Sequence, residues 1–554
     1  AAPRQADRVS SRQPRLPVDG RPPDGPTTPG DGGGGRRLAV STAFFSAATG
    51  ISRVAGLVRE IIAASYFGVS GAMSAFTIAF QVPNLMRALF ADAALQGAFV
   101  PVFTELLEKG RRREAITVAW SVFSLMAALL GVVTLLFFAL AGPIMSAVTP
   151  GFHNSPELRH MTIVMSRIMF PVVLLLALSG IVVGMLNSLG HFSVPALTPV
   201  IWNVIIIGCL VFLRGRFIFP HQIYAYAIGV LLGTIAQFVI PLPVLFRAGI
   251  PFKLVFDWHN PDVWRVLRLM LPVTIALGLI NFDALINSIF GTLVSDQAPA
   301  AIDKAFRIYQ LPQGLFSVAI ATVLFPTLAR LAARGDHHNL RYRMANGVRQ
   351  TLLLLIPSAV LLAVLSVPIT RLVYQRGAFG GGATHLVSLA LLCWSFSLPF
   401  QGASLLYSRT FFSLQKPWLN TSLAGINLLV NATFSAIFYY PWGITGVVLG
   451  SVAGTFAMAV SQALVLRRDL HGIDGYETVR TVARIVLATI AMGLTSYFVW
   501  WMFDVGLGRS LIAQIISLGA GIGAGILVYA GAVTRMNVPE AHQIRRLLLN
   551  RAGL

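Results

Sequence analysis

Residues 115–142 read AITVAWSVFSLMAALLGVVTLLFFALAG, a stretch without a single charged residue. About 20 apolar residues in a helix span the ~30 Å hydrocarbon layer of a membrane, so this stretch predicts a transmembrane helix. The whole chain shares this character, because 56% of its 554 residues are hydrophobic and only 11% are charged. A soluble domain typically carries about 25% charged residues. We therefore expect a membrane protein.

Thirteen further apolar runs of similar length occur along the chain, two before this stretch and eleven after it. They are residues 39–67, 73–105, 161–190, 194–213, 221–247, 262–294, 299–333, 348–374, 382–413, 417–440, 443–467, 478–503 and 510–534. A membrane β-barrel would instead show alternating segments of about ten residues. The sequence therefore predicts an all-α membrane protein of about 14 transmembrane helices.

The net charge of +21 is distributed in a way that predicts the orientation of the chain. Basic residues gather in alternate loops, while the loops at 68–72, 295–298 and 441–443 carry no Lys or Arg. The basic clusters are Arg36 and Arg37; Lys109 and Arg111 to Arg113; Arg247 and Lys253; Arg334, Arg341 and Arg343; Arg467 and Arg468; and Arg545, Arg546 and Arg551. Because cytoplasmic loops are enriched in Lys and Arg, we expect both termini in the cytoplasm, with Arg214 and Arg216 as an exception on the outer side. This distribution explains the charge without a nucleic acid partner.

Two halves of the chain resemble each other at an offset of about 225–230 residues. Val82-Pro83-Asn84-Leu85 has a counterpart in Leu311-Pro312-Gln313-Gly314, and a second pair of motifs lies at 187–191 and 412–416. Six helices separate each pair, so we expect two parallel six-helix bundles related by a pseudo-two-fold axis along the membrane normal. The expected units are a disordered cytoplasmic tail over 1–36, an N-terminal bundle over 37–247, a C-terminal bundle over 248–468, and two extra helices with a basic cytoplasmic tail over 469–554.

Four arginines lie inside expected transmembrane helices, namely Arg53, Arg59, Arg87 and Arg307. A charge at bilayer depth costs about 2.5–3.5 kcal/mol, so it is retained where it faces a polar cavity or a partner. Guanidinium is permanently charged and binds phosphate oxygens in a bidentate geometry, so the four arginines predict a diphosphate site. Two alternatives remain open. Arg53 and Arg59 extend to the cytoplasmic headgroups, or Arg307 forms a structural pair with Asp303 or Asp296.

A second polar group lies in two other expected helices. Asn281, Asp283 and Asn287 in one helix, and Asn427 and Asn431 in the other, place side-chain oxygens at about one-turn spacing. These oxygens predict a monovalent cation site. Interhelical hydrogen bonds that only support packing are an equal alternative.

Five motifs occur in order along the chain. They are Ser52-Arg53-x-x-Gly56-x-x-Arg59-Glu60, Val82-Pro83-Asn84-Leu85-x-Arg87, Ala98-Phe99-Val100-Pro101, Gln375-Arg376-Gly377-Ala378-Phe379 and Tyr407-Ser408-Arg409. Together they resemble the MurJ/MviN family over about residues 38–535. The resemblance implies a member of the multidrug/oligosaccharidyl-lipid/polysaccharide exporter superfamily. Members of this family flip lipid II, the undecaprenyl-diphosphate-linked precursor of peptidoglycan.

The resemblance also implies roles for individual residues. The four arginines would line a central cavity and meet the diphosphate. The expected substrate site is completed by Ser52, Glu60, Asn84 and Gln310. Asp283 and Asn427 would match a sodium site proposed for some members, with Asn287 and Asn431 beside them.

The chain departs from the family pattern at three positions. It has Ser74 where many relatives have an aspartate, Gln310 where many have a glutamate, and Asn431 where the sodium-site pattern has an aspartate. Fewer cavity acids suit an anionic substrate and weaken the prediction of coupling to sodium or protons.

We expect a flippase that moves lipid II from the cytoplasmic to the outer leaflet of the bacterial cytoplasmic membrane by alternating access. It would act as a monomer, with no cofactor other than a sodium ion. The alternatives are an exporter of another polyprenyl-linked saccharide, a cation-coupled drug exporter, and a membrane enzyme acting on a lipid carrier. An enzyme would need a set of catalytic carboxylates, for which Asp92 and Glu105 are the remaining candidates.

Overall fold

The computed structural model describes residues 32–90, 93–253, 255–257 and 259–541. All regular secondary structure in these ranges is helical, which confirms the predicted all-α class. The tail expected over 1–36 falls largely on residues outside these ranges, and the first described helix begins at Gly32. Asp92 also lies outside the described residues.

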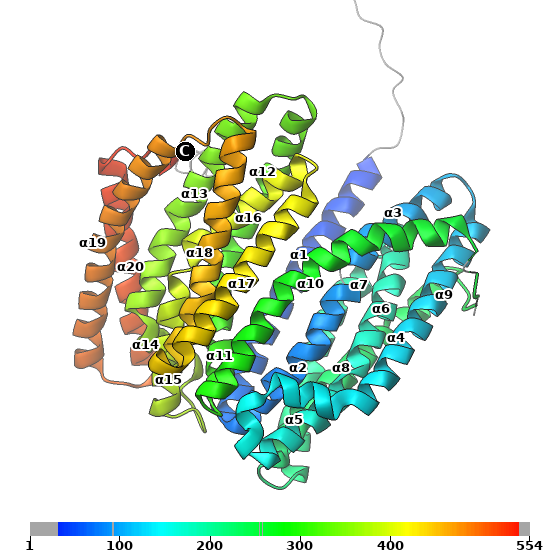
Figure 1. Cartoon of the computed structure of the whole chain (residues 1–554), viewed down its shortest axis with the longest axis horizontal. Helices are drawn as coiled ribbons and strands as arrows, with labels where there is room; N and C mark the ends of the chain where they lie inside the picture. Colours follow the sequence, from blue (N-terminus) through cyan, green and yellow to red (C-terminus); the bar gives the residue numbers. More distant parts are fainter. Residues whose placement is uncertain (1–31, 91–92, 254, 258, 542–554) are drawn as a thin grey trace, which may run out of the picture.

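The described residues up to 294 contribute ten α-helices and four short helices. They are α1 (Gly32–Phe67), α2 (Gly71–Phe90), α3 (Ala93–Glu108), α4 (Arg112–Val148), η1 (Pro150–Asn154), α5 (Pro156–Met169), α6 (Pro171–Ser188), α7 (Ser193–Gly208), η2 (Cys209–Leu213), η3 (Arg214–Arg216), η4 (His221–Ile223), α8 (Tyr224–Val239), α9 (Pro241–Arg247) and α10 (Pro261–Val294). Helices α2 to α9 gather on one side of the molecule in Figure 1.

The rest of the described chain forms the other side of the molecule (Figure 1). Its helices are α11 (Ala298–Pro312), η5 (Gln313–Ser317), α12 (Val318–Ala333), α13 (His337–Val364), α14 (Ser366–Tyr374), α15 (Gly381–Ser395), α16 (Leu398–Ser413), α17 (Pro417–Trp442), α18 (Ile444–Asp469), α19 (Gly475–Leu507) and α20 (Leu511–Arg535). Helix α10 packs against α2 and α3 on one side and against α17 and α18 on the other, so it contacts both halves.

Each expected transmembrane segment coincides with one described helix or with consecutive described helices. Among the described residues, ten helical segments are long and apolar enough to cross a membrane. Helices α15 and α16, which are bent by 48° at their junction, form an eleventh if they are one span. The number fourteen therefore stays a prediction.

Local sequence explains where several helices break or begin. Pro171 starts α6, because proline tolerates the first turn of a helix, and Pro312 is followed by the wider turn η5. Helix α13 begins at His337, earlier than the expected residue 348, because Asp336 caps it by accepting a 3.1 Å hydrogen bond from the Asn339 backbone N–H. Hydrogen bonds from the Asn339 side chain and backbone also lower the pKa of Asp336.

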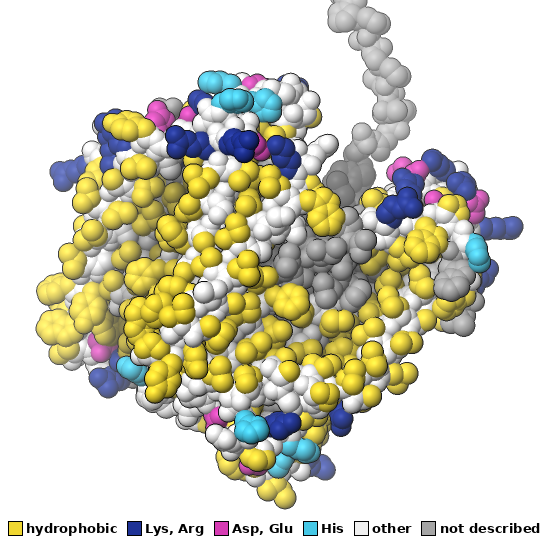
Figure 2. Space-filling view, viewed as in Figure 1, with side chains coloured by type: hydrophobic (Ala, Val, Ile, Leu, Met, Phe, Trp, Pro, Cys, Tyr) yellow, Lys and Arg dark blue, Asp and Glu magenta, His cyan; other side chains and the backbone are white. Residues whose placement is uncertain are grey.

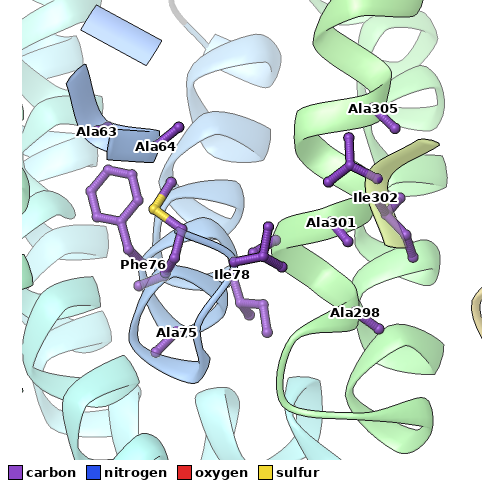
Figure 3. Packing of buried hydrophobic residues seen from close by; sticks show 14 of the residues in the cluster. Ala63, Ala64, Ala75, Phe76, Ile78, Ala298, Ala301, Ile302 and Ala305 are labelled. Atoms are coloured by element: carbon purple, nitrogen blue, oxygen red, sulfur yellow. The ribbon is translucent and has the colours of Figure 1, made fainter. Parts of the chain in front are cut away.

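Helices α2 and α11 meet where the two halves pack together. Figure 3 shows Ile78 of α2 pointing toward α11, and the small residues Ala75 of α2 and Ala298 and Ala301 of α11 are buried like Ile78. Small residues let membrane helices approach closely. The buried Ser74 hydroxyl accepts a 3.2 Å hydrogen bond from the backbone N–H of Ala300, a residue 226 positions further along the chain. This separation matches the predicted repeat offset of about 225–230 residues, so the contact joins two helices that the repeat predicts to correspond.

The outer surface is apolar over its middle and charged at its ends. Figure 2 shows hydrophobic side chains over the flank of the bundle, while Lys and Arg gather mainly at the two ends. Large side chains within the helices face outward, such as Leu135, Leu494 and Leu527, which are 72%, 70% and 75% exposed. A surface of this kind is stable in lipid and would aggregate in water. The protein is a multi-pass membrane protein.

Ion pairs hold α19 and α20 to the second half at both ends. At one end, Arg349 Nε in α13 lies 2.5 Å from Glu540 Oε1, just beyond α20, and both side chains are at most 5% exposed. At the other end, Arg371 Nη1 in α14 lies 3.2 Å from Asp504 Oδ1 in α19. The helix pair is therefore attached to the second half as one body.

Glu540→Gln should lower the free energy of unfolding by about 3 kcal/mol, because it leaves the buried charge of Arg349 without its close counter-charge. Glu477→Gln is the matched control, since Glu477 also faces Arg349, at 3.8 Å, but its side chain is 71% exposed. The measurement is thermal unfolding of the purified proteins in detergent. Equal melting temperatures for Glu540→Gln and the unchanged protein would contradict this anchoring role.

Candidate functional site

Three cationic side chains form ion pairs with one buried carboxylate in α1, that of Glu60. Glu60 is 4% exposed. Its Oε2 lies 2.6 Å from Lys304 Nζ, and its Oε1 lies 2.7 Å from Arg59 Nη2 and 3.1 Å from Arg307 Nη1. The Tyr226 hydroxyl of α8 also donates to Oε1, at 3.2 Å. Because α1 and α8 belong to the first half and α11 carries Lys304 and Arg307, the carboxylate connects both halves.

Further contacts fix the two arginines. Arg59 Nη1 donates a 3.0 Å hydrogen bond to Asn203 Oδ1 in α7, and its guanidinium lies 4.7 Å from the ring centroid of Trp202. Arg307 Nε donates a 2.8 Å hydrogen bond to Asp303 Oδ2 in the preceding turn. The predicted alternative of an Arg307–Asp303 pair is thus present, and the same guanidinium also reaches Glu60.

We name Arg59, Glu60, Asp303, Lys304 and Arg307 the charged cluster. It contains three cations and two carboxylates, so it has one positive charge in excess. Burial strengthens the field of this excess charge, because little water is present to screen it. The cluster is therefore suited to an anion.

The other predicted substrate residues lie outside these contacts. On α1, the Arg53 side chain is exposed and Ser52 is half-buried. On α2, Arg87 Nε and Nη2 donate to Asn84 Oδ1 at 3.1 and 2.8 Å, so these two form a separate pair. Gln310 is exposed, one turn beyond Arg307 on α11. The structure joins Arg59, Glu60 and Arg307 directly, through α1 and α11, and places the remaining predicted residues on α1, α2 and α11.

Three residues of the site were not predicted from the sequence, namely Lys304, Tyr226 and Asn203. Lys304 offered a signal, because it is a lysine within an expected membrane helix, three residues before Arg307. Its side chain is 0% exposed. Tyr226 and Asn203 gave a weaker signal, since neither side chain carries a charge at neutral pH.

Three of the predicted cation residues come together between α10 and α17, namely Asp283, Asn287 and Asn431. Asn431 Nδ2 donates to Asp283 Oδ1 at 2.7 Å and to Asn287 Oδ1 at 3.2 Å. The Ser451 hydroxyl of α18 donates to Asn287 Oδ1 at 2.8 Å. The buried Oδ1 of Asn427 accepts no hydrogen bond from any described residue. A carboxylate oxygen and an amide oxygen without a hydrogen-bond partner among the described residues are hard ligands that fit a small cation. The hydrogen bonds of the Asn431 amide also agree with the alternative that these residues only support helix packing.

The two halves also meet through backbone atoms near the end of α1. The Ala378 backbone N–H donates a 2.8 Å hydrogen bond to the Ser65 carbonyl. Gly68 and Gly377 both have positive φ, at 59° and 58°. A Cβ atom at Gly377 would lie 2.3 Å from the Ser65 oxygen, so only glycine fits. We name these four residues the backbone clasp, which closes this end of the interface.

A cavity of about 720 Å³ lies beside the backbone clasp. Tyr66, Glu157, Phe219 and Asp296 are among its lining residues and come from both halves. The guanidinium of Arg214 lies 3.9 Å from the Tyr66 ring centroid. Arg214, the exception in the predicted charge distribution, therefore packs on the end of α1.

A multi-pass helical protein whose two halves meet around buried charges has the architecture of a membrane transporter. The sequence model of the family described as lipid II flippase MurJ matches residues 63–514. The chain therefore belongs to the MurJ family, which confirms the resemblance seen in its motifs.

Individual relatives agree with this assignment. The chain is 30% identical over 519 residues to the probable lipid II flippase MurJ of Rhizobium meliloti, covering 92% of this chain and 96% of the relative. It is 32% identical over 352 residues to the lipid II flippase MurJ of Burkholderia cenocepacia, covering 63% and 68%.

Two solved structures share the fold. Lipid II flippase MurJ in an inward closed conformation matches with a TM-score of 0.73 at 26% identity, covering 89% of this chain and 99% of that one. An inward-facing multidrug resistance transporter of the MATE family matches with a TM-score of 0.62 at 16% identity, covering 76% and 96%. The second similarity concerns the fold alone.

Gly377→Ala should destabilise the state seen here by more than the ~1–2 kcal/mol that a left-handed conformation costs a non-glycine residue, because the added Cβ also meets the Ser65 carbonyl. Gly380→Ala is the matched control, since a Cβ there meets nothing within 4 Å. Melting temperatures of the purified variants measure the effect. A Gly377→Ala protein as stable as the Gly380→Ala protein would show that the backbone clasp contributes nothing.

Proposed function

We propose that this protein is a flippase that moves lipid II from the cytoplasmic to the outer leaflet of the bacterial cytoplasmic membrane. Relatives that match over most of the chain are named lipid II flippases. The observation that carries the proposal is the convergence of Arg59, Lys304 and Arg307 on a single buried carboxylate. Such an excess of buried positive charge favours an anionic ligand, and lipid II carries a diphosphate.

The diphosphate would bind to Arg59 and Arg307. A guanidinium offers two parallel N–H donors to phosphate oxygens, which adds geometric specificity to the charge attraction. Arg53 and Arg87 would contact the headgroup further along α1 and α2, together with Ser52, Asn84 and Gln310. The polyprenyl tail would stay in lipid against the apolar flank of the bundle.

Transport would proceed by alternating access between the two halves. Opening toward the outer side requires the backbone clasp to separate and the charged cluster to exchange partners. Both termini would be cytoplasmic, as the basic loops predict, and thiol labelling of cysteines placed at Ser70 and Arg343 in intact cells can test this orientation. The protein would act as a monomer.

The alternative functions are less well supported by the same contacts. A cation-coupled drug exporter would favour acids in its binding site, whereas the charged cluster has one positive charge in excess. For a membrane enzyme, the candidate acid Glu105 is already engaged by Lys109 at 2.6 Å and Arg265 at 3.0 Å. Another polyprenyl-linked saccharide would present the same diphosphate, and only transport assays distinguish it from lipid II.

Arg59→Ala and Arg307→Ala should each abolish flipping, because each removes a permanent charge and two donors from the diphosphate site. Arg330→Ala is the control, since it removes an exposed arginine from α12. The measurement is rescue of bacterial cells depleted of their own lipid II flippase, with membrane levels of each variant checked in parallel. Full rescue by both site variants would refute the diphosphate site, and failure of the unchanged protein would refute lipid II as the substrate.

We also propose that Asp283 and Asn427, with Asn287 and Asn431, hold a sodium ion. The unpaired Asn427 oxygen and the Asp283 carboxylate supply hard oxygen ligands. The Asn431 amide would turn its oxygen toward the ion in place of its N–H donors. The bound ion would supply a positive charge next to Asp283.

Sodium at about ten times its dissociation constant should stabilise the protein by roughly 1.4 kcal/mol relative to the same concentration of potassium. Asp283→Asn should remove this difference, because the charged ligand is lost. Asp469→Asn is the control, since that acid pairs with Lys416 at a distant exposed site. Melting curves in the two salts that coincide for the unchanged protein would refute sodium binding and leave the packing role.

A further inference from the structure

We propose that Lys304 is a positioning residue that lets a diphosphate take Arg59 and Arg307 away from Glu60. This inference rests on the proposed function, because it concerns the same site. Lys304 compensates the charge of Glu60 both before and after the substrate binds. The two arginines can therefore leave the carboxylate and bind the diphosphate oxygens instead.

The two oxygens of Glu60 have different partners. Oε2 pairs with the Lys304 ammonium at 2.6 Å. Oε1 is shared by Arg59 at 2.7 Å, Arg307 at 3.1 Å and the Tyr226 hydroxyl at 3.2 Å. Two guanidinium groups thus share one oxygen atom, whereas a diphosphate offers each of them oxygens of its own. The exchange concerns Oε1 and leaves the Lys304 pair intact.

Lys304, which keeps its contact with Glu60, differs in burial and contacts from Arg59 and Arg307, which change partners. Lys304 is 0% exposed, and its ammonium lies 5.7 Å from the ring centroid of Tyr374 in α14. Arg307 is 33% exposed, so a ligand can reach it. Arg59 is more enclosed, but its buried Nε finds no hydrogen-bond partner among the described residues. An N–H donor without a partner is available to an incoming phosphate oxygen.

Charge balance explains why a lysine is needed. When the two arginines turn to a diphosphate, the Glu60 carboxylate remains buried, with a side chain that is 6% exposed. An uncompensated buried charge is strongly unfavourable, so without Lys304 the carboxylate would retain the arginines and compete with the substrate. With Lys304 present, the remaining pair is neutral. Because Glu60 lies on α1 and Lys304 on α11, this pair also keeps the two halves in contact during the exchange.

The test compares four purified full-length variants by their affinity for undecaprenyl diphosphate in detergent. Lys304→Met should weaken binding about tenfold, because Glu60 then holds both arginines. Glu60→Gln should bind about threefold more tightly, because the competing carboxylate is gone. Lys304→Met combined with Glu60→Gln should return to within about threefold of the unchanged protein, which is the signature of coupling between two residues in contact. Lys416→Met, which removes an exposed lysine paired with Asp469, is the control and should bind normally.

Each outcome decides the matter. Unchanged affinity of Lys304→Met, or a double variant that binds as weakly as Lys304→Met, would overturn the proposal. If Lys304 only supports packing, Lys304→Met and the double variant should show equally lowered melting temperatures and equally weakened binding. If Lys304→Met does not fold, the Glu60→Gln variant still provides a test. Weaker binding by Glu60→Gln than by the unchanged protein would refute the idea that Glu60 competes with the diphosphate for the two arginines. Failure of the unchanged protein to bind undecaprenyl diphosphate would refute the proposed function itself. Normal binding by the unchanged protein, together with any of the contradicting results named above, would refute only the role of Lys304.

Discussion

The rest of this structure depends on the burial of the Glu60 carboxylate within a membrane-spanning bundle. An isolated charge is not tolerated at that depth, so Glu60 requires Arg59 on its own helix and Lys304 and Arg307 on α11. This requirement brings α1 close to a helix of the other half. The small residues of α2 and α11 make the close approach possible, and the same charges leave a positive excess for an anionic ligand.

The bilayer sets the remaining constraints. Every backbone polar group in hydrocarbon must be satisfied within the protein, which permits long helices and restricts irregular backbone to buried or polar places. The backbone clasp follows this rule, because the Ala378 N–H finds the Ser65 carbonyl at the end of α1. Helices α19 and α20 are secured by ion pairs at both ends, Arg349 with Glu540 and Arg371 with Asp504. These ion pairs attach the helix pair to the second half in this structure.

The structure brings some of the predicted site residues together, and their role in binding substrate stays a prediction. Arg59, Glu60 and Arg307 were expected to act together and do lie in contact, because rare charges in apolar helices are retained only beside partners. Arg53 and Gln310 are exposed, and spacing along a helix does not say which face a neighbouring helix covers. Lys304 was missed, although it carries the same kind of signal, because only its complete burial against Glu60 distinguishes it from a lysine that extends to the headgroups.

The sequence by itself determined the helices, their approximate ends and the family, because a bilayer demands long apolar runs and because several motifs occur in order. Only the tertiary structure decided which charges pair. The Lys304–Glu60 contact joins residues 244 positions apart, and the Ser74–Ala300 contact joins residues 226 apart. Composition and spacing describe one helix at a time, whereas the pairing of buried charges depends on which helices pack together and on how completely that packing excludes water.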